Sequence, residues 1–394
     1  MKLLSLYVLI TATLCVRAAV PCTIVASGGD DAPVLALALA SCRQVLIPKD
    51  TTLSIRTALN TTNVKNTHLS LQGTIKYYED LEYWGANAFP FEFQNVYTFW
   101  LLGGKGIVVD GGGVIDGNGQ FWWDGLTTNS SLVRPIPLTV YQGDGVIIRN
   151  ITMKQAPFWF NLVHTSKNVV YSDITIRTTS NGNKSSNTDG WDTYRSNRVA
   201  IINSDIINSD DCVSFKPNST NILVSNLNCT GSHGISVGSL GQYPQYIDIV
   251  ENVTVRNVNL TNASNGVRIK VWAGANRGSG RVNNILYENT RVNNVDNPLV
   301  FDQCYMTNAT ACAAQAARVD ITNVTVRGIT GTSSGSAKSL IASLICSPGA
   351  VCENIRVDDF SVEPPEQYKP GTTKCSNLDV QGNAADLFDC ASTV

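Results

Sequence analysis

Long apolar runs are scarce in this chain of 394 residues. One apolar stretch, from Leu3 to Cys15, follows Lys2 and ends before Val16-Arg17-Ala18, a pattern typical of a secretory signal and its cleavage site. No later stretch approaches the roughly 20 apolar residues of a membrane-spanning helix. We therefore expect residues 1–18 to be a signal peptide and residues 19–394 to be a secreted, extracellular chain that has no membrane as partner.

Basic residues and histidines are also few. Lys and Arg total 29 against 31 Asp and Glu, so the net charge is −2. A nucleic-acid-binding protein would need a basic face, and we expect no nucleic-acid partner. Among the three histidines, His68 and His164 are interpreted as structural, and His233 has no cluster of zinc ligands around it at the usual spacing. We expect neither a metal nor a cofactor.

The chain further lacks a linker and, with one exception, helical periodicity. A length like that of residues 19–394 often forms more than one globular domain, but no Pro/Ser-rich segment or charge run divides it. Apolar residues follow a helical spacing only in Pro33–Cys42, which we expect to form an N-terminal cap helix. A single repetitive domain explains the length, because a solenoid grows without needing a larger globular core.

A short repeat is present instead. Eight segments share Asn, Gly or Arg at the start, an alternating β-branched run, and a polar ending that is typical of a strand between tight turns. They start at Gly145, Asn168, Arg198, Asn221, Asn252, Asn284, Asn323 and Asn354, so the shortest interval is 23 residues. We expect an all-β solenoid of parallel strands with stacked asparagines at its turns. An antiparallel sandwich is the alternative, but it does not predict such a repeat.

Cysteines and glycosylation sequons agree with secretion. Without Cys15 the eleven cysteines become ten, an even number that indicates disulfides. Near neighbours suggest five local bridges, Cys22–Cys42, Cys212–Cys229, Cys304–Cys312, Cys346–Cys352 and Cys375–Cys390. Eleven Asn-x-Ser/Thr sequons occur, and we expect some of them to lie on inward-facing or crowded positions.

Four polar clusters follow one another at about the length of the repeat. Asp189 precedes Asp211 by 22 residues, and Asp211 precedes His233 by 22 again. Residues one coil apart stack roughly 4.8 Å from each other. The clusters are Asn187-Thr188-Asp189-Gly190, Asp210-Asp211-Cys212, Gly231-Ser232-His233-Gly234 and Arg268-Ile269-Lys270. The spacing predicts three carboxylates, a histidine and a cationic pair on one face of the solenoid.

Carboxylates grouped in this way are typical of glycoside hydrolysis. An inverting enzyme needs an acid and a base about 6.5–9.5 Å apart with a water between them, and Asp189 and Asp210 on adjacent coils are candidates. An isolated Asp-Asp pair would more simply form a solvated turn, but a third acid and His233 on flanking coils argue against that. Arg268 and Lys270 lie on the same side of a strand, where they would recognise an acidic sugar.

Together these motifs resemble those of glycoside hydrolase family 28, the polygalacturonases. The resemblance implies a right-handed parallel β-helix and inverting hydrolysis of polygalacturonate, a pectic polysaccharide, by a monomer. It implies that Asp210 is the general acid, that Asp189 and Asp211 activate water, and that His233 tunes or relays the proton. It further assigns substrate binding to Asn187, Arg268, Lys270 and Tyr305.

The residues within and around the motifs are most similar to those of fungal exo-acting members, which release galacturonate from the non-reducing end. These stretches are NTDGWDTYRS, DDCVSFKPN, GSHGISVGSLGQY and RIKVWAG. A xylogalacturonan hydrolase or an endo-polygalacturonase of the same family is the alternative. A polysaccharide lyase fits the three acids and histidine less well, and a non-catalytic wall-binding solenoid would have no use for them.

Overall fold

The computed structural model describes residues 21–183 and 185–391. The expected signal peptide, residues 1–18, lies outside this part of the chain, so that prediction and the domain boundary at residue 19 remain predictions. Within the described residues, no helix has the length and apolar character needed to cross a membrane. One sheet of 26 strands runs from Cys22 to Ala391.

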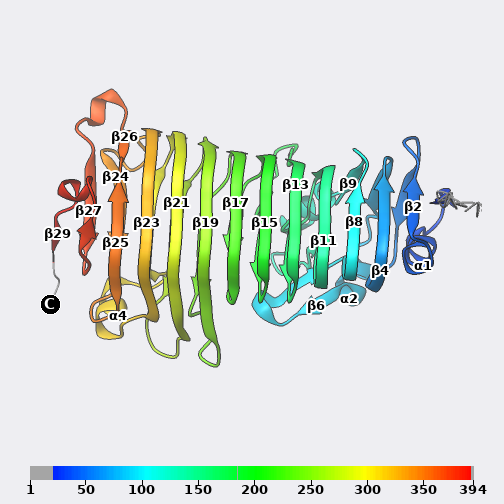
Figure 1. Cartoon of the computed structure of the whole chain (residues 1–394), viewed down its shortest axis with the longest axis horizontal. Helices are drawn as coiled ribbons and strands as arrows, with labels where there is room; N and C mark the ends of the chain where they lie inside the picture. Colours follow the sequence, from blue (N-terminus) through cyan, green and yellow to red (C-terminus); the bar gives the residue numbers. More distant parts are fainter. Residues whose placement is uncertain (1–20, 184, 392–394) are drawn as a thin grey trace, which may run out of the picture.

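This sheet is wound so that each strand pairs in parallel with the strands one coil before and after it. The long strands form one row that runs the length of the molecule (Figure 1). They are β2 (Gln44–Ile47), β4 (Leu59–Leu71), β8 (Trp100–Asp110), β11 (Leu138–Lys154), β13 (Lys167–Arg177), β15 (Asn197–Ile207), β17 (Ser219–Thr230), β19 (Ile247–Thr261), β21 (Ser279–Val295), β23 (Arg318–Ser333) and β25 (Cys352–Asp358). The predicted all-β parallel β-helix is confirmed.

The repeat sets the register of these coils. The residue after each repeat start lies opposite its counterpart in the next coil, as Val169 does with Val199 and Ile222 with Val253. These residues are buried in the core. Each repeat start itself has a positive φ, for example 57° at Asn221, a left-handed conformation that Asn tolerates better than most residues. The repeat is therefore a turn followed by a core-facing strand.

Asparagine side chains stack at these turns, as expected. The Asn252 amide donates to Asn221 at 3.2 Å, and the Asn284 amide donates to Asn252 at 2.8 Å. These bonds satisfy the side chains of consecutive turns and hold neighbouring coils in register.

A second row of short strands carries the polar clusters. It consists of β12 (Asn161–His164), β14 (Trp191–Tyr194), β16 (Val213–Phe215), β18 (Ile235–Leu240), β20 (Asn265–Trp272), β22 (Asn297–Tyr305), β24 (Leu340–Ile345), β27 (Thr372–Ser376) and β29 (Cys390–Ala391). The remaining strands of the main sheet are β1 (Cys22–Thr23), β3 (Thr52–Ile55), β5 (Thr74–Tyr77), β9 (Val114–Asp116), β26 (Ser361–Glu363) and β28 (Val380–Gln381).

The expected cap helix is confirmed as α1 (Ala32–Ser41), which lies at the N-terminal end of the stack (Figure 1). The described residues also contain short helices that the sequence periodicity did not reveal. Three more α-helices form, α2 (Leu81–Asn87), α3 (Gln120–Leu126) and α4 (Ala309–Ala314), with the short 3-10 helices η1 (Phe93–Asn95), η2 (Glu366–Tyr368) and η3 (Ala385–Leu387). The three α-helices span only six or seven residues each, too few for a clear helical period.

A small second sheet lies outside the coils. It is formed by β6 (Phe89–Phe91), β7 (Val96–Thr98) and β10 (Pro135–Ile136), and its β6–β7 pair is antiparallel. Residues 78–99, which contain α2, β6, η1 and β7, are therefore an insertion between coils rather than a coil of their own.

All five predicted disulfides are present. Each joins cysteines that are 6 to 20 residues apart in the sequence, less than the length of one coil. Each of the eleven sequon asparagines is exposed or half-buried, so none of them faces inward. Asn183 is in a crowded position, as was expected for some of them, because it is half-buried and its side-chain amide donates to Asp124 at 2.6 Å.

Candidate active site

The polar clusters lie where β14, β16 and β18 begin. Trp191 is opposite Val213, and Val213 is opposite Ile235, so the 22-residue spacing is one coil of the helix. The Asn208 amide donates to the carbonyls of Thr188, Asp210 and Asp211 at 2.8–3.0 Å. Asn208 thus holds the turns that carry the three acids.

Asp211 is the fixed anion of this group. It is buried, and its oxygens accept from Arg268 at 2.8 Å and from Lys270 at 2.8 Å. The Ser236 hydroxyl adds a third bond at 2.8 Å. Burial alone would raise the pKa of Asp211, but Lys270 and Arg268 outweigh it and hold this pKa well below its usual range. Asp211 therefore stays ionised.

Asp189 is in the opposite situation. It is buried, and its Oδ1 atom has no hydrogen-bond partner among the described residues. Burial, followed by the nearby charges of Asp210 and Asp192, raises the pKa of Asp189 well above its usual value. A proton is therefore held in the cluster on or beside Asp189.

Asp210 lies between these two acids and His233. Its Oδ1 atom is 3.1 Å from Nδ1 of His233, and its Oδ2 atom accepts from the Asn187 amide at 3.3 Å. Its side chain is 18% exposed, while that of Asp211 is 1% exposed. Asp210 is therefore the more accessible of these two neighbouring acids.

The three acids lie close together, as expected for residues on one face of the solenoid. One oxygen from each of Asp189, Asp210 and Asp211 lies within 4.8 Å of the others. The reason is that Asp210 and Asp211 are adjacent in the turn before β16, and Asp189 lies in the corresponding turn one coil earlier. Such a group of oxygens is a possible cation site, but Arg268 and Lys270 already supply the positive charge at Asp211.

These residues line a cavity of about 430 Å³. All eight residues predicted from the sequence are among its lining residues, together with five others, Gln94, Phe158, Trp159, Lys216 and Ser239. The structure therefore brings every predicted site residue together.

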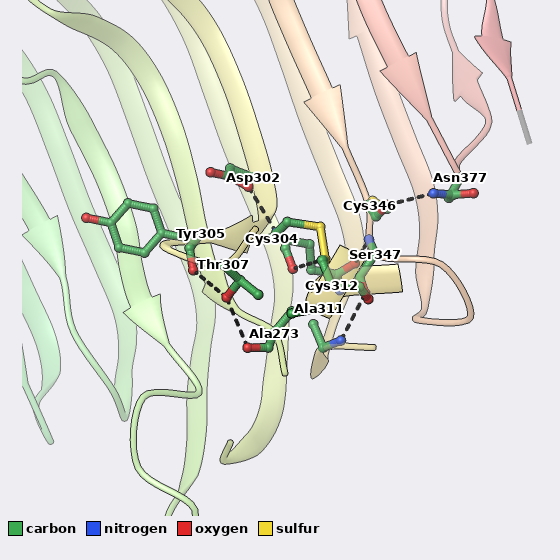
Figure 2. The surroundings of a disulfide bond; sticks show 12 residues. Ala273, Asp302, Cys304, Tyr305, Thr307, Ala311, Cys312, Cys346, Ser347 and Asn377 are labelled. Carbon is green, nitrogen blue, oxygen red and sulfur yellow. Dashed lines mark hydrogen bonds between the residues drawn. A yellow bond between two sulfur atoms is a disulfide. The ribbon is translucent and has the colours of Figure 1, made fainter. Parts of the chain in front are cut away.

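Tyr305 is placed at the edge of this cavity by a small disulfide loop. Figure 2 shows it next to Cys304, which is bonded to Cys312 in α4. The Thr307 hydroxyl donates to the carbonyls of Tyr305 and Ala273, at 3.1 Å each. The ammonium of Lys270 lies 5.8 Å from the centre of the Tyr305 ring, so the ring can lie beside a sugar that Lys270 contacts.

The insertion of residues 78–99 contributes Gln94 to the wall of the cavity. The Gln94 side-chain amide donates to Oε1 of Gln242 at 3.1 Å, and the Gln94 backbone N–H donates to the hydroxyl of Tyr243 at 3.1 Å. Phe93 stacks on Tyr194 with ring centres 4.1 Å apart. Gln94 and Phe158 line both the acidic cavity and a neighbouring hollow, so we call this pair the partition.

Several site residues were missed by the sequence analysis. Arg134 donates to Oδ1 of Asn187 at 2.8 Å and its guanidinium lies over Phe158 at 4.6 Å. Gln94 and Arg134 come from distant loops and gave no signal. Asp192 and Lys216 lie within stretches that the sequence analysis quoted, three residues after Asp189 and five after Asp211. The alternation of side-chain directions along the strands could have identified them, but it was not used.

Comparisons with known proteins agree with this site. The model described as Glycosyl hydrolases family 28 matches residues 39–385. An exopolygalacturonase of Cochliobolus carbonum is 44% identical over 361 residues, which cover 87% of this chain and 81% of that protein. Exopolygalacturonase X of Aspergillus niger is 43% identical over 343 residues, covering 83% of this chain and 79% of that protein.

Solved structures show the same fold. The endo-xylogalacturonan hydrolase from Aspergillus tubingensis has a TM-score of 0.85 and 29% identity, covering 95% of this chain and 99% of that one. The polygalacturonase from Erwinia carotovora ssp. carotovora has a TM-score of 0.72 and 19% identity, covering 93% and 99%. At the lower identity the similarity concerns the fold alone.

Proposed function

Because the chain belongs to glycosyl hydrolase family 28, we propose that it is a secreted enzyme that hydrolyses α-1,4-galacturonosidic bonds in polygalacturonate. The observation that carries this proposal is the group of three carboxylates beside Arg268 and Lys270 in one cavity. Cations beside the acids suit a uronic acid polymer, since guanidinium and ammonium groups bind carboxylates well. Five disulfides support secretion to an oxidising compartment.

In the proposed mechanism Asp189, whose pKa is raised by burial and then by neighbouring acids, passes its proton to Asp210, which has an oxygen within 4.8 Å. Asp210 delivers it to the leaving oxygen, because its side chain is accessible and is held by His233 and Asn187. His233 would tune this acid or return its proton after each turnover. Asp189, ionised once the proton is on Asp210, accepts the proton of the attacking water, and Asp211, which stays ionised, helps to activate this water by accepting a hydrogen bond from it. Attack from the face opposite the leaving group would invert the anomeric centre.

We further propose that cleavage is exo, with release of a single galacturonate from the non-reducing end. The partition supports this, because Gln94 and Phe158 lie between the acidic cavity and the neighbouring hollow and would interrupt the groove on that side of the acids. A chain cannot lie across a blocked groove, so its end must enter. The terminal sugar would lie between the partition and the acids, and Arg268, Lys270 and Tyr305 would hold the next sugar.

A xylogalacturonan hydrolase is the second candidate. The observation that favours it is the similarity in structure to the endo-xylogalacturonan hydrolase from Aspergillus tubingensis. An endo-polygalacturonase would require an open groove, which the partition does not favour. A lyase would form an unsaturated sugar, and a wall-binding solenoid would release nothing.

The test is to analyse the first products from plain and xylose-substituted galacturonan. Saturated galacturonate alone, released faster from the plain polymer, is the expected result. Mixed oligomers would overturn exo action, faster release from the substituted polymer would overturn the plain substrate, and an unsaturated product would overturn hydrolysis.

A further inference from the structure

A second buried lysine faces the same cavity. Lys216 follows β16, and its side chain is 6% exposed, similar to the 7% of Lys270. Its ammonium lies 3.2 Å from Oδ1 of Asp192 and 5.0 Å from the centre of the Trp159 ring. The mechanism above gives this lysine no task, although it lines the cavity.

The position of Lys216 places it on the partition side of the acids. Asp192 belongs to the preceding coil, on β14, and Trp159 precedes β12, one coil earlier still. Trp159 lines the cavity next to Phe158 of the partition. The cations on the other side, Arg268 and Lys270, come from β20. The two sets of cations therefore flank the acids.

The floor between the two lysines is bare backbone. Phe215 is opposite Val237 and Gly238 is opposite Lys270, so Gly238 lies on the coil between Lys216 and Lys270. A Cβ atom at Gly238 would be only 2.4 Å from the carbonyl oxygen of Lys270. Glycine at this position therefore lets the two coils lie close together beneath the lysines, and the next residue, Ser239, lines the cavity.

Lys216 has donors to spare for a ligand. An ammonium has three N–H donors, and Asp192 is its one ion-pair partner among the described residues. Burial alone would lower the pKa of Lys216, but Asp192 and then Asp189 raise it above its usual value, so the group stays charged. Asp192 is fully buried beneath Lys216 and does not line the cavity, so the donors of Lys216 that do not face Asp192 are the ones that a ligand can use.

We propose that Lys216 is a specificity-determining residue that binds the carboxylate of the terminal uronic acid, held beside Trp159 and the partition. This inference rests on the proposed function for the identity of the sugar. Two carboxylates, one on each side of the scissile bond, would then be recognised separately, the terminal one by Lys216 and the next by Arg268 and Lys270.

Binding of trigalacturonate, measured by calorimetry in an Asp210→Asn background, tests this without turnover. The test variant is a double variant, Lys216→Met with Asp192→Asn. Both charges are removed together so that neither one is left buried and unpaired. The ligands are trigalacturonate and the same trisaccharide whose non-reducing terminal carboxyl is reduced to an alcohol. Lys154→Met is the control, since Lys154 forms an ion pair of the same 3.2 Å length with Asp116 outside the cavity.

The double variant should weaken trigalacturonate binding roughly 10- to 100-fold, the range for a hydrogen bond to a charged group. It should change binding of the reduced ligand by less than about 3-fold, because that ligand has no terminal carboxylate for Lys216 to bind, as in a double-mutant cycle. Equal losses for both ligands, or no loss for either, would overturn the inference. Hydrolysis by the unmodified enzyme is measured in parallel, so that a chain that binds through Lys216 but cleaves nothing refutes only the proposed function.

Discussion

At the scale of single residues, Asp189 and Asp211 are both buried but have opposite pKa shifts. Asp211 has two cations within 2.8 Å, while Asp189 has acids as its nearest charged neighbours. Two like groups are thereby given different protonation states at one pH, which is the requirement for acid–base catalysis by carboxyl groups.

Asp210→Asn should lower kcat by about 10²–10⁴-fold, the usual contribution of a general acid. The change keeps the shape of the side chain and so should leave substrate binding and folding intact. Steady-state kinetics and calorimetry check this. Asp205→Asn is the control, because Asp205 is on the neighbouring coil but pairs with Arg177 at 2.6 Å. An Asp210 variant within a few-fold of the control would contradict the assignment.

The raised pKa of Asp189 has a consequence for stability. Between the ordinary carboxyl pKa, about 3.9, and its raised value, the folded state binds more protons than the unfolded state, so stability falls as pH rises. Asp189→Asn removes this loss and should gain stability relative to the parent as pH increases from about 4. Asp211→Asn should show the opposite trend, because its lowered pKa contributes stability that is lost as pH falls. Denaturant unfolding across pH measures both, and parallel curves would contradict this account.

The sequence located these acids because coil spacing alone stacks them. Asp189, Asp211 and His233 needed only two equal intervals of 22 residues to be grouped. The carboxyl separation could not be predicted, since it depends on side-chain directions at the turns. Asp192 and Lys216 were missed because they form a buried ion pair between two adjacent coils. Strand alternation is the only sequence pattern that such a pair produces.

At the scale of elements, the insertion of residues 78–99 contributes Gln94 to the cavity wall, and in the proposed account it ends the groove. It was not predicted, because the repeat begins after it and its helices are short. Its contacts with Tyr194, Gln242 and Tyr243 join segments about 100–150 residues apart in sequence, and no local pattern reports such contacts.

Phe93→Ala combined with Gln94→Ala should open the partition. The stack on Tyr194 and the side-chain bond to Gln242 would be lost, and longer chains could then lie across the acids. Oligomers should appear among the early products, and viscosity should fall faster for each bond cut. Phe121→Ala is the control, since Phe121 is an exposed aromatic residue of α3 that does not line the cavity. Unchanged monomer-only products in the double variant would show that the partition does not set the mode of cleavage.

At the scale of the whole molecule, the parallel β-helix and all five disulfides followed from the repeat and the cysteine spacing. A repeat fixes strand register over many coils, and local bridges are the ones that such a coil permits. Insertions between coils, such as residues 78–99, interrupt the repeat, so the repeat could not predict them. The ends also need protection, because an open coil presents unpaired strand edges.

Leu35→Asp should release the N-terminal cap. Leu35 is fully buried in α1, and its replacement should cost at least the roughly 2–5 kcal/mol of a core cavity, since a carboxylate is buried as well. Oligomers should form through the exposed edge, as light scattering would detect. Leu37→Asp, on the same helix but 65% exposed, should remain a stable monomer. Equal behaviour of the two variants would contradict a capping role.

The central claim is that the bond cut lies one sugar from the partition, with the non-reducing end held there. The most direct measurement uses trigalacturonate that carries a label at its reducing end, with products separated after the first turnovers. The account predicts unlabelled galacturonate and a labelled disaccharide. Labelled galacturonate with an unlabelled disaccharide would show that the chain enters in the opposite direction, and would contradict the account.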